Sequence, residues 1–185
     1  MGRWQPDARG RLERAAFELY LEKGFGRTTV AQITERAGLT TRTFFRHFAD
    51  KCDVLFVGQE ELRARIANTV AAAPESWPPV RAAASALNIA AAALQLRREE
   101  ARDRRKLISA TPELRERELS VFAAVATTVA DALRTRGAEE CTARIVAEAL
   151  TAAFRVAFES WAENPDRELP QLVDEALDEL RAAFA

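Results

Sequence analysis

The chain has 185 residues, enough for one large domain or two small ones whose hydrophobic core needs no disulfide or metal to stabilise it. Its 27 Lys/Arg and 28 Asp/Glu residues give a net charge of −1, so composition alone does not indicate a nucleic-acid-binding protein. No stretch approaches the roughly 18 uncharged apolar residues of a membrane span, which predicts a cytoplasmic protein with no membrane partner.

Charge is unevenly distributed along the chain. Residues 1–52 contain ten Lys/Arg and six Asp/Glu, a net charge of +4, whereas the remaining residues contain 17 and 22, a net charge of −5. A basic part beside an acidic part is expected where only the first contacts phosphate. We therefore predict a DNA-binding domain over residues 1–52 and a second domain over residues 53–185.

Neither a metal site nor a catalytic centre is predicted. Cys52 and Cys141 are far apart and outside any C-x-x-C or Cys/His ligand spacing. His47 is the only histidine, and no carboxylate motif accompanies it that could complete a relay or a metal centre. A helical enzyme is an alternative class, but no nucleophile, base and orienting group occur together. No cofactor is predicted.

Helical periodicity runs through the whole sequence. Ala, Leu, Glu and Arg are frequent, apolar residues recur at spacings of three and four, and the alternating runs typical of strands are absent. This predicts an all-α fold of about nine helices. Glycines and prolines separate the predicted helices, whose approximate ranges are 7–23, 29–37, 41–48, 51–72, 79–97, 98–110, 113–136, 139–163 and 168–184.

The second and third predicted helices form a helix-turn-helix. The second begins with the capping box Thr29-x-x-Gln32, and Gly38 allows the positive φ that a sharp turn needs. Leu39 and Phe44 are expected to fill the angle between the two helices. The remaining positions of the third helix mix hydrogen-bonding, cationic and aromatic groups, which suits a helix lying in the major groove of DNA.

This region resembles the DNA-binding region of the TetR family of bacterial repressors. The similar stretch covers roughly residues 9–57 and includes AAFELYLEKGFGRTT followed by TVAQITERAGLTTRTFFRHFADKCDVLF. The rest of the chain resembles the family only in being helical and of the right length. The segment TRTFFRHF is most similar to regulators grouped with binders of acyl-CoA-like ligands.

The resemblance implies roles for individual residues. Thr28, Thr29 and Lys51 would hold DNA phosphates, and His47 would reach another. Thr41, Arg42 and Phe45 would face base edges, with Arg42 at a guanine and Phe45 at a thymine methyl group. The complete set of predicted DNA-binding residues is Thr28, Thr29, Thr40, Thr41, Arg42, Thr43, Phe45, Arg46, His47 and Lys51.

Some interpretations of charged and aromatic residues stay open. Phe45 fits a DNA contact better than a core position, and Arg46 is either a solvated charge or a phosphate contact. The run from Arg97 to Lys106 has six cations and three anions. Such a run is typical of a solvated helix face, whereas contact with an anionic ligand head is the alternative.

The last two predicted helices are expected to form a homodimer interface. One presents a small-residue face and the other a leucine-rich face, and the resemblance implies that such faces pair across a two-fold axis. A dimer would read two half-sites about 34–36 Å apart. The small-residue face is formed by Ile145, Ala149, Ala152, Ala153 and Val156, and the leucine-rich face by Leu169, Leu172, Val173, Ala176, Leu177 and Leu180.

The second domain has more large apolar residues than two dimer faces need, and it lacks the polar clusters that a sugar or metal would require. We therefore predict a cavity for a hydrophobic or amphipathic effector. Its predicted lining is Leu87, Leu94, Phe122, Val125, Phe154 and Phe158. The last four of these fall at helical spacing and fit a plain hydrophobic core first, because periodicity does not separate a core from a pocket wall.

These expectations combine into a regulator that binds a double-stranded DNA operator and is released by its effector. A non-specific architectural DNA binder is the alternative, and equal affinity for all sequences would favour it.

Overall fold

The computed structural model describes residues 7–164 and 166–183, and within them the fold is all-α, as predicted, with no strand. None of the helices in these ranges is long and apolar enough to cross a membrane. The helices are α1 (Ala8–Lys23), α2 (Val30–Ala37), α3 (Thr41–His47), α4 (Gln59–Ala72), α5 (Pro79–Gln95), α6 (Arg98–Ser109), α7 (Pro112–Thr135), α8 (Glu140–Glu163) and α9 (Leu169–Ala182), with a 3-10 turn, η1 (Asp53–Phe56), before α4.

The contacts divide the chain into two compact units. The first unit extends up to Val57 and also includes Asp103–Glu118, the end of α6 and the start of α7. The second unit contains Gly58–Arg102 and the chain from Leu119 onward. The boundary predicted from the sequence lies after residue 52. No pattern in the sequence indicated that the second half of α6, from Asp103 onward, belongs to the first unit.

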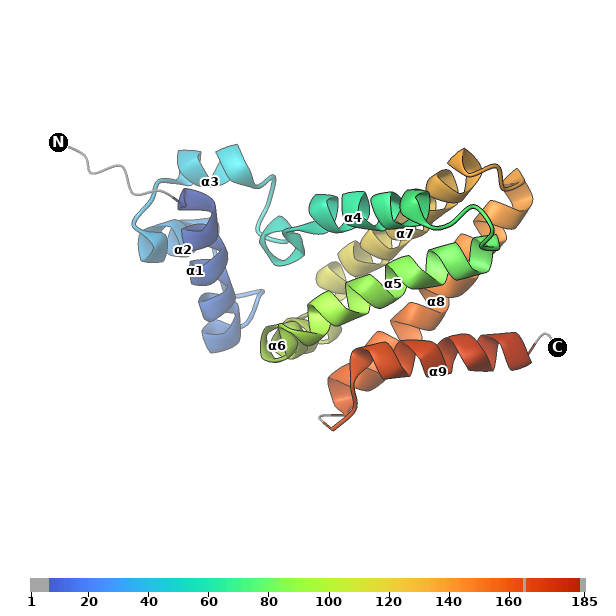
Figure 1. Ribbon diagram of the computed structural model, residues 1–185. Helices are drawn as coiled ribbons and strands as arrows, with labels where there is room; N and C mark the ends of the chain where they lie inside the picture. The colour runs from blue at the N-terminus through green and yellow to red at the C-terminus, as the bar shows by residue number, and fades with distance from the viewer. Residues whose placement is uncertain (1–6, 165, 184–185) are drawn as a thin grey trace. The chain divides into compact units, whose positions relative to one another are not determined.

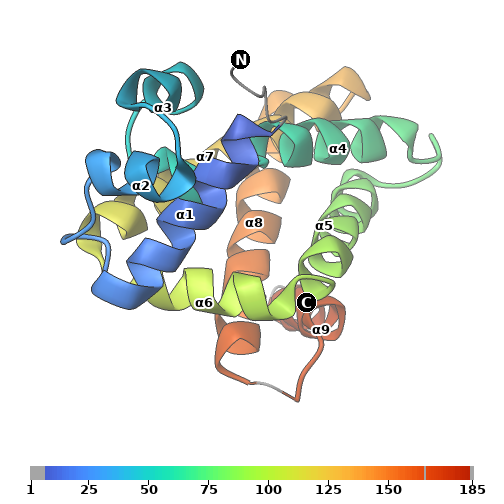
Figure 2. The ribbon, with the colours of Figure 1, turned by 90° about the vertical axis from the view of Figure 1, so that its left-hand side faces the viewer.

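The first unit is built on α1, which contacts both α2 and α3 (Figure 1). Its buried stripe follows the predicted helical spacing. The buried residues of this stripe are Leu12, Ala15, Ala16, Leu19 and Tyr20. The two short helices α2 and α3 lie next to each other in a second view of the same unit (Figure 2). Because helices of two turns are marginal alone, their packing on α1 is what holds them.

The predicted single helix over residues 51–72 is wrong. Asp50 accepts hydrogen bonds from the backbone N–H groups of Cys52 and Asp53, but the helical turn that follows is only the short η1. The chain then breaks at Gly58, whose φ of 82° lies in the left-handed region. Glycine adopts that conformation without the steric penalty of a Cβ atom, so a new helix, α4, begins at Gln59.

The second unit is a helical bundle around an alanine-rich core. α5 contacts α4, α8 and α9, and α8 and α9 also contact each other (Figure 1). Small side chains let these helices approach closely, and larger ones fill the remaining space. The largest fully buried side chains of this core include Trp161, Leu87, Leu133, Ile66 and Leu169.

Candidate DNA and ligand sites

The turn between α2 and α3 is fixed by hydrogen bonds at the end of α2. Gly38 adopts a left-handed conformation with φ 62°, and its N–H donates to the carbonyls of Glu35 and Thr34. The Arg11 guanidinium, reaching across from α1, donates to the Ala37 carbonyl. A Cβ atom at Gly38 would lie 2.9 Å from Arg11 Nη2. The left-handed backbone conformation therefore favours glycine at this position, whereas the flexible Arg11 side chain could shift away from a Cβ atom.

Two phenylalanines anchor α3 and leave its other face free. Phe44 is fully buried and Phe48 nearly so, with ring centroids 5.3 Å apart. The N-terminus of α3 is capped by Thr40, whose hydroxyl accepts from the Thr43 N–H. Phe45 is 56% exposed although it is aromatic. The remaining exposed side chains of this helix are Thr41, Arg42, Arg46 and His47. An exposed, cationic and aromatic face on a helix held from behind is suited to contact with DNA.

Thr29 lies at the N-terminus of α2, where the capping box is present as predicted. Its hydroxyl accepts from the Gln32 N–H, and its own N–H donates to Gln32 Oε1. Thr29 is exposed, whereas Thr28 is only 1% exposed. The Thr28 hydroxyl donates to the Gly24 carbonyl at 3.0 Å. The structure therefore gives Thr28 an internal partner and no access to solvent.

Lys51 is tied to the loop before α2. Its Nζ donates to the carbonyls of Phe25 and Thr28 at 2.9 and 3.0 Å, and it lies 4.2 Å from the centroid of the Phe25 ring. Its own carbonyl accepts from the Tyr20 hydroxyl. Burial raises the pKa of that phenol above its usual range. These contacts connect the segment after α3 to the entry of α2.

The Lys51 contacts predict a loss of stability on replacement. Lys51→Met keeps the aliphatic stem but removes the ammonium group. The Phe25 carbonyl keeps the Thr28 N–H as a donor, whereas the Thr28 carbonyl loses the donor described above. We expect the Tm to fall by several degrees, because one lost charged hydrogen bond is worth about 1.5–3 kcal/mol. Thermal unfolding measured without DNA checks this. The contrary result is an unchanged Tm together with a slope of log DNA affinity against log salt concentration that falls by about one. It would show that Lys51 serves only as a phosphate ligand.

The structure brings the six predicted effector residues into one apolar cluster of the second unit. Leu87 of α5, Val125 of α7 and Phe154 of α8 are buried in it, and Leu94, Phe122 and Phe158 pack against it. The rings of Phe154 and Phe158 stack at 6.5 Å with an interplanar angle of 6°. Side chains from three helices thus meet, as a shared cavity wall or a shared core would require.

Sequence reasoning missed a polar contact beside this cluster. Gln95 Oε1, at the end of α5, accepts hydrogen bonds from Trp161 Nε1 at 2.9 Å and from the Leu169 N–H at 3.0 Å. One amide oxygen therefore positions the largest buried side chain and the start of α9. A buried tryptophan needs a hydrogen-bond acceptor for its N–H. The prediction of a buried Trp161 could therefore have prompted a search for such an acceptor.

The charge run from Arg97 to Lys106 is only partly a solvated face, since its two end residues are exposed but several arginines between them have partners within the chain. Arg98 Nη2 donates to the carbonyls of Asn164 and Arg167, and Arg102 Nε donates to the Ala162 carbonyl. Both side chains thus satisfy carbonyls at and just after the C-terminal end of α8, where cations are favoured. In the first unit, Arg105 pairs with Glu118 at 2.6 Å. These contacts also leave the anionic-ligand alternative without support.

The first unit contains an open groove of about 430 Å³ that was not predicted. Its walls come from the end of α1, the loop that follows it, and the residues around Lys106 and Thr111. None of the six predicted effector residues lines it. In residues 7–164 and 166–183, no three His, Cys, Asp or Glu side chains are close enough to hold a metal ion.

The two predicted dimer faces differ in the structure. The leucine-rich face of α9 is buried within the chain, since Leu172 and Leu177 are at most 7% exposed, so its assignment as an interface is wrong. Ala153 is likewise buried. Ile145 and Val156 of α8 are 63% and 59% exposed. We name the α8 stripe from the residues that share this outward line, Ile145, Ala149, Ala152 and Val156.

Two family models match the chain in succession. Residues 13–56 match the model described as bacterial regulatory proteins, tetR family, and residues 75–185 match the MftR C-terminal domain, a C-terminal model of the same family. The chain is also 52% identical over 46 residues to the HTH-type transcriptional regulator TcmR of Streptomyces glaucescens. That stretch covers 25% of this chain and spans only 20% of the length of TcmR.

Solved structures share the fold over nearly the whole chain. The SmeT–triclosan complex has a TM-score of 0.67 and 22% identity, covering 95% of this chain and 90% of SmeT, a protein of Stenotrophomonas maltophilia. Thermus thermophilus FadR, in complex with lauroyl-CoA, has a TM-score of 0.59 and 23% identity, covering 93% of this chain and 92% of FadR. At these identities the similarity establishes the architecture.

Proposed function

The chain belongs to the TetR family of bacterial regulatory proteins, and from this premise we propose that it is a cytoplasmic, homodimeric repressor released from its operator by a hydrophobic or amphipathic small molecule. Regulators of this family bind DNA and are generally not enzymes. The observation that carries the proposal is the outward face of α3, which holds exposed cations and an exposed aromatic ring against two buried phenylalanines.

In the proposed complex, the N-terminal part of α3 enters the major groove. Arg42 and Thr41 stand in its first turn, where a recognition helix contacts base edges, and Phe45 follows one turn later. The phosphate contacts proposed around them come from Thr29, Thr40, Thr43, Arg46 and His47. Thr28 and Lys51 act differently, because their polar groups already bind the loop before α2. They position the domain rather than touch DNA.

The second copy in the proposed dimer is held through the α8 stripe. Two large aliphatic side chains more than half exposed on one line of a helix are a reason to expect a partner surface. In a two-fold dimer the α8 stripe of one copy would pack against the α8 stripe of the other, with the two helices running in opposite directions. Two recognition helices at a fixed separation then read two half-sites, whereas one alone buries too little surface for specific affinity.

The effector proposal rests on the apolar cluster that contains the six predicted residues. FadR of Thermus thermophilus was solved with lauroyl-CoA and SmeT with triclosan, and both ligands have large apolar parts. By analogy, an apolar ligand part would lie among Leu87, Phe122 and Phe154, between α5, α7 and α8. Binding there would favour one separation of the two DNA-binding domains over another.

Selection of DNA from a random library tests the DNA-binding part of the proposal. The full chain should enrich one sequence made of two inverted half-sites, and its affinity for that sequence should exceed that for scrambled DNA by at least about a thousandfold. Equal affinity for all sequences would support the architectural alternative and contradict the proposal.

Thermal unfolding with added ligands tests the effector part. Lauroyl-CoA, lauric acid and triclosan are suitable probes, with glucose and citrate as polar controls. A ligand at 100 times its Kd stabilises the folded state by about 2.7 kcal/mol, and the Tm should rise by about 5–10 °C. The same ligand should release the selected operator. Stabilisation by a polar control and by none of the apolar probes would contradict an apolar effector.

A further inference from the structure

The second unit has a buried hydroxyl without a hydrogen-bond partner. Thr151 lies in the middle of α8 and is 6% exposed, and its Oγ1 has no partner within the part of the chain that the structure describes. Two other threonines are buried to a similar degree, and both donate to backbone carbonyls, Thr28 to Gly24 and Thr34 to Ala31. A buried, unpaired polar group destabilises the folded state, so Thr151 needs an explanation.

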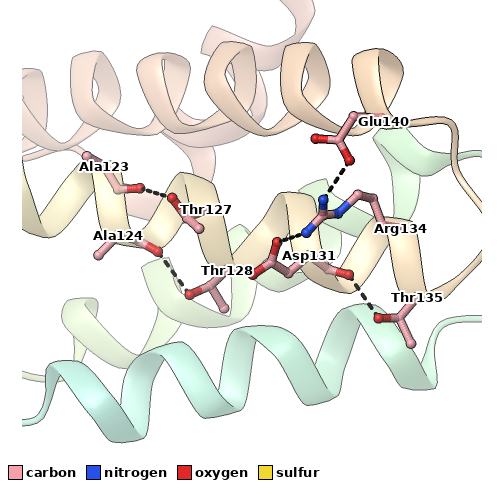
Figure 3. A network of polar contacts seen from close by, with 8 residues as sticks. All are labelled: Ala123, Ala124, Thr127, Thr128, Asp131, Arg134, Thr135 and Glu140. Atoms are coloured by element: carbon pink, nitrogen blue, oxygen red, sulfur yellow. Dashed lines mark hydrogen bonds and ion pairs between the residues drawn. The ribbon is translucent and has the colours of Figure 1, made fainter.

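The usual solution for a helical threonine is visible in α7. Thr127 donates to the Ala123 carbonyl, Thr128 to Ala124 and Thr135 to Asp131, each four residues back (Figure 3). α8 offers the same acceptor to Thr151 at Ala147, yet the structure has no such bond. Both the donor and the acceptor of the Thr151 hydroxyl are therefore available to another molecule.

Thr151 stands on the same line of α8 as the stacked aromatic pair. Phe154 and Phe158 follow it by three and seven residues, a spacing that places the three side chains on one face. The aromatic line continues to Trp161, 5.7 Å from the Phe158 ring. Among the buried residues of the second unit that the structure describes, none carries a charged side chain, and Thr151 has the one buried hydroxyl.

We propose that the Thr151 hydroxyl is the hydrogen-bonding anchor of the effector, and that the effector is a largely apolar, planar molecule with a neutral hydroxyl or carbonyl group. This deepens the function proposed above and rests on it. A planar apolar body suits the stacked phenylalanine rings. An ionised carboxylate does not suit this position, because one hydroxyl cannot compensate a buried charge.

The first test needs no ligand. Thr151→Val keeps the side-chain shape and removes the unpaired hydroxyl, so we expect the Tm of the unliganded protein to rise by about 2–4 °C. The matched control is Thr128→Val, which removes a hydroxyl that has a partner and should not raise the Tm. A lower Tm for Thr151→Val would mean that its hydroxyl is satisfied in the folded protein, which overturns the proposal.

The second test measures binding of 2-naphthol and naphthalene by calorimetry. The wild-type protein should prefer 2-naphthol, and Thr151→Val should weaken 2-naphthol binding about tenfold while leaving naphthalene unchanged. Thr151→Ser should restore the preference. If the wild-type protein and Thr151→Val show the same ratio of 2-naphthol to naphthalene affinity, the protein has an apolar site, but the role proposed for Thr151 is wrong. If the wild-type protein binds neither probe, the inference of a planar effector anchored by Thr151 is wrong, whereas the apolar site itself is tested separately by the thermal unfolding experiments above.

Discussion

Replacing Ile145 and Val156 together by glutamate is expected to convert the proposed dimer to a monomer and to weaken operator binding at least about a hundredfold. These side chains are the most exposed large apolar residues of the α8 stripe. Two like charges from each copy would meet across the two-fold axis in a setting with little water. Once the second DNA-binding domain is no longer tethered, its high effective concentration at the other half-site is lost.

Sedimentation velocity and titration of the selected operator check this result together. The matched control is Ile89→Glu with Leu119→Glu, which adds the same charge at two exposed apolar positions on α5 and α7. The control should stay dimeric and bind normally. Helical content should be close to wild type in both double variants, since all four positions face solvent within the chain. The Tm should be unchanged in the control and lower in the monomeric variant, because dimerisation stabilises the folded state. A wild-type protein that sediments as a monomer at micromolar concentration would refute the proposed interface.

The faces of single helices could be predicted from the sequence, but their neighbours could not. Periodicity identified an apolar line on α9 and a small-residue line on α8, and both lines exist. It could not determine that the α9 line packs against α5 and α8 of the same chain. Leu177 was therefore assigned to a dimer interface although it is 3% exposed within the chain. Periodicity reports which side of a helix is buried and carries no information about what buries it.

Long-range polar contacts were also beyond sequence reasoning. Arg98 and Arg102 reach carbonyls about 60 to 70 residues away in the chain, and Arg136 does the same for the carbonyl of Ala73 after α4. A guanidinium at a helix C-terminus is a favourable arrangement. The sequence does not indicate, however, which of its many arginines lies at which helix end. From the sequence, Arg98 and Arg102 were interpreted only as part of a charge run. In the structure, all three arginines donate hydrogen bonds to carbonyl groups at or near the C-terminal ends of helices.

The DNA-binding region was the most predictable part because its signals are local. The capping box at Thr29, the glycine at the turn and the burial of Phe44 depend on residues within a few positions of each other. Gly58 carried an equally local signal that was overlooked, and the break before α4 was missed with it. Thr151 gave no signal of its own, since a threonine in an apolar helix is ordinary until its hydrogen bonds are known.

Arg42→Ala is expected to reduce discrimination between operator and scrambled DNA while leaving the fold intact. Arg42 is the second residue of α3, and its side chain is exposed. In the proposed complex its planar guanidinium donates two hydrogen bonds to one guanine, a contact worth about 1–3 kcal/mol, or roughly a factor of 5 to 150 in the affinity ratio. Fluorescence anisotropy with operator and scrambled duplexes at one fixed salt concentration measures that ratio.

Arg46→Ala is the matched control, because it removes the same charge from the same helix one turn further on. If Arg46 contacts a phosphate, its removal should weaken binding to both duplexes alike. The slope of log affinity against log salt concentration should then fall by about one. Arg42→Ala should instead affect the operator far more than the scrambled duplex. An unchanged ratio for Arg42→Ala would show that this side chain does not read a base, and an altered ratio for Arg46→Ala would shift the proposed base contact one turn along α3.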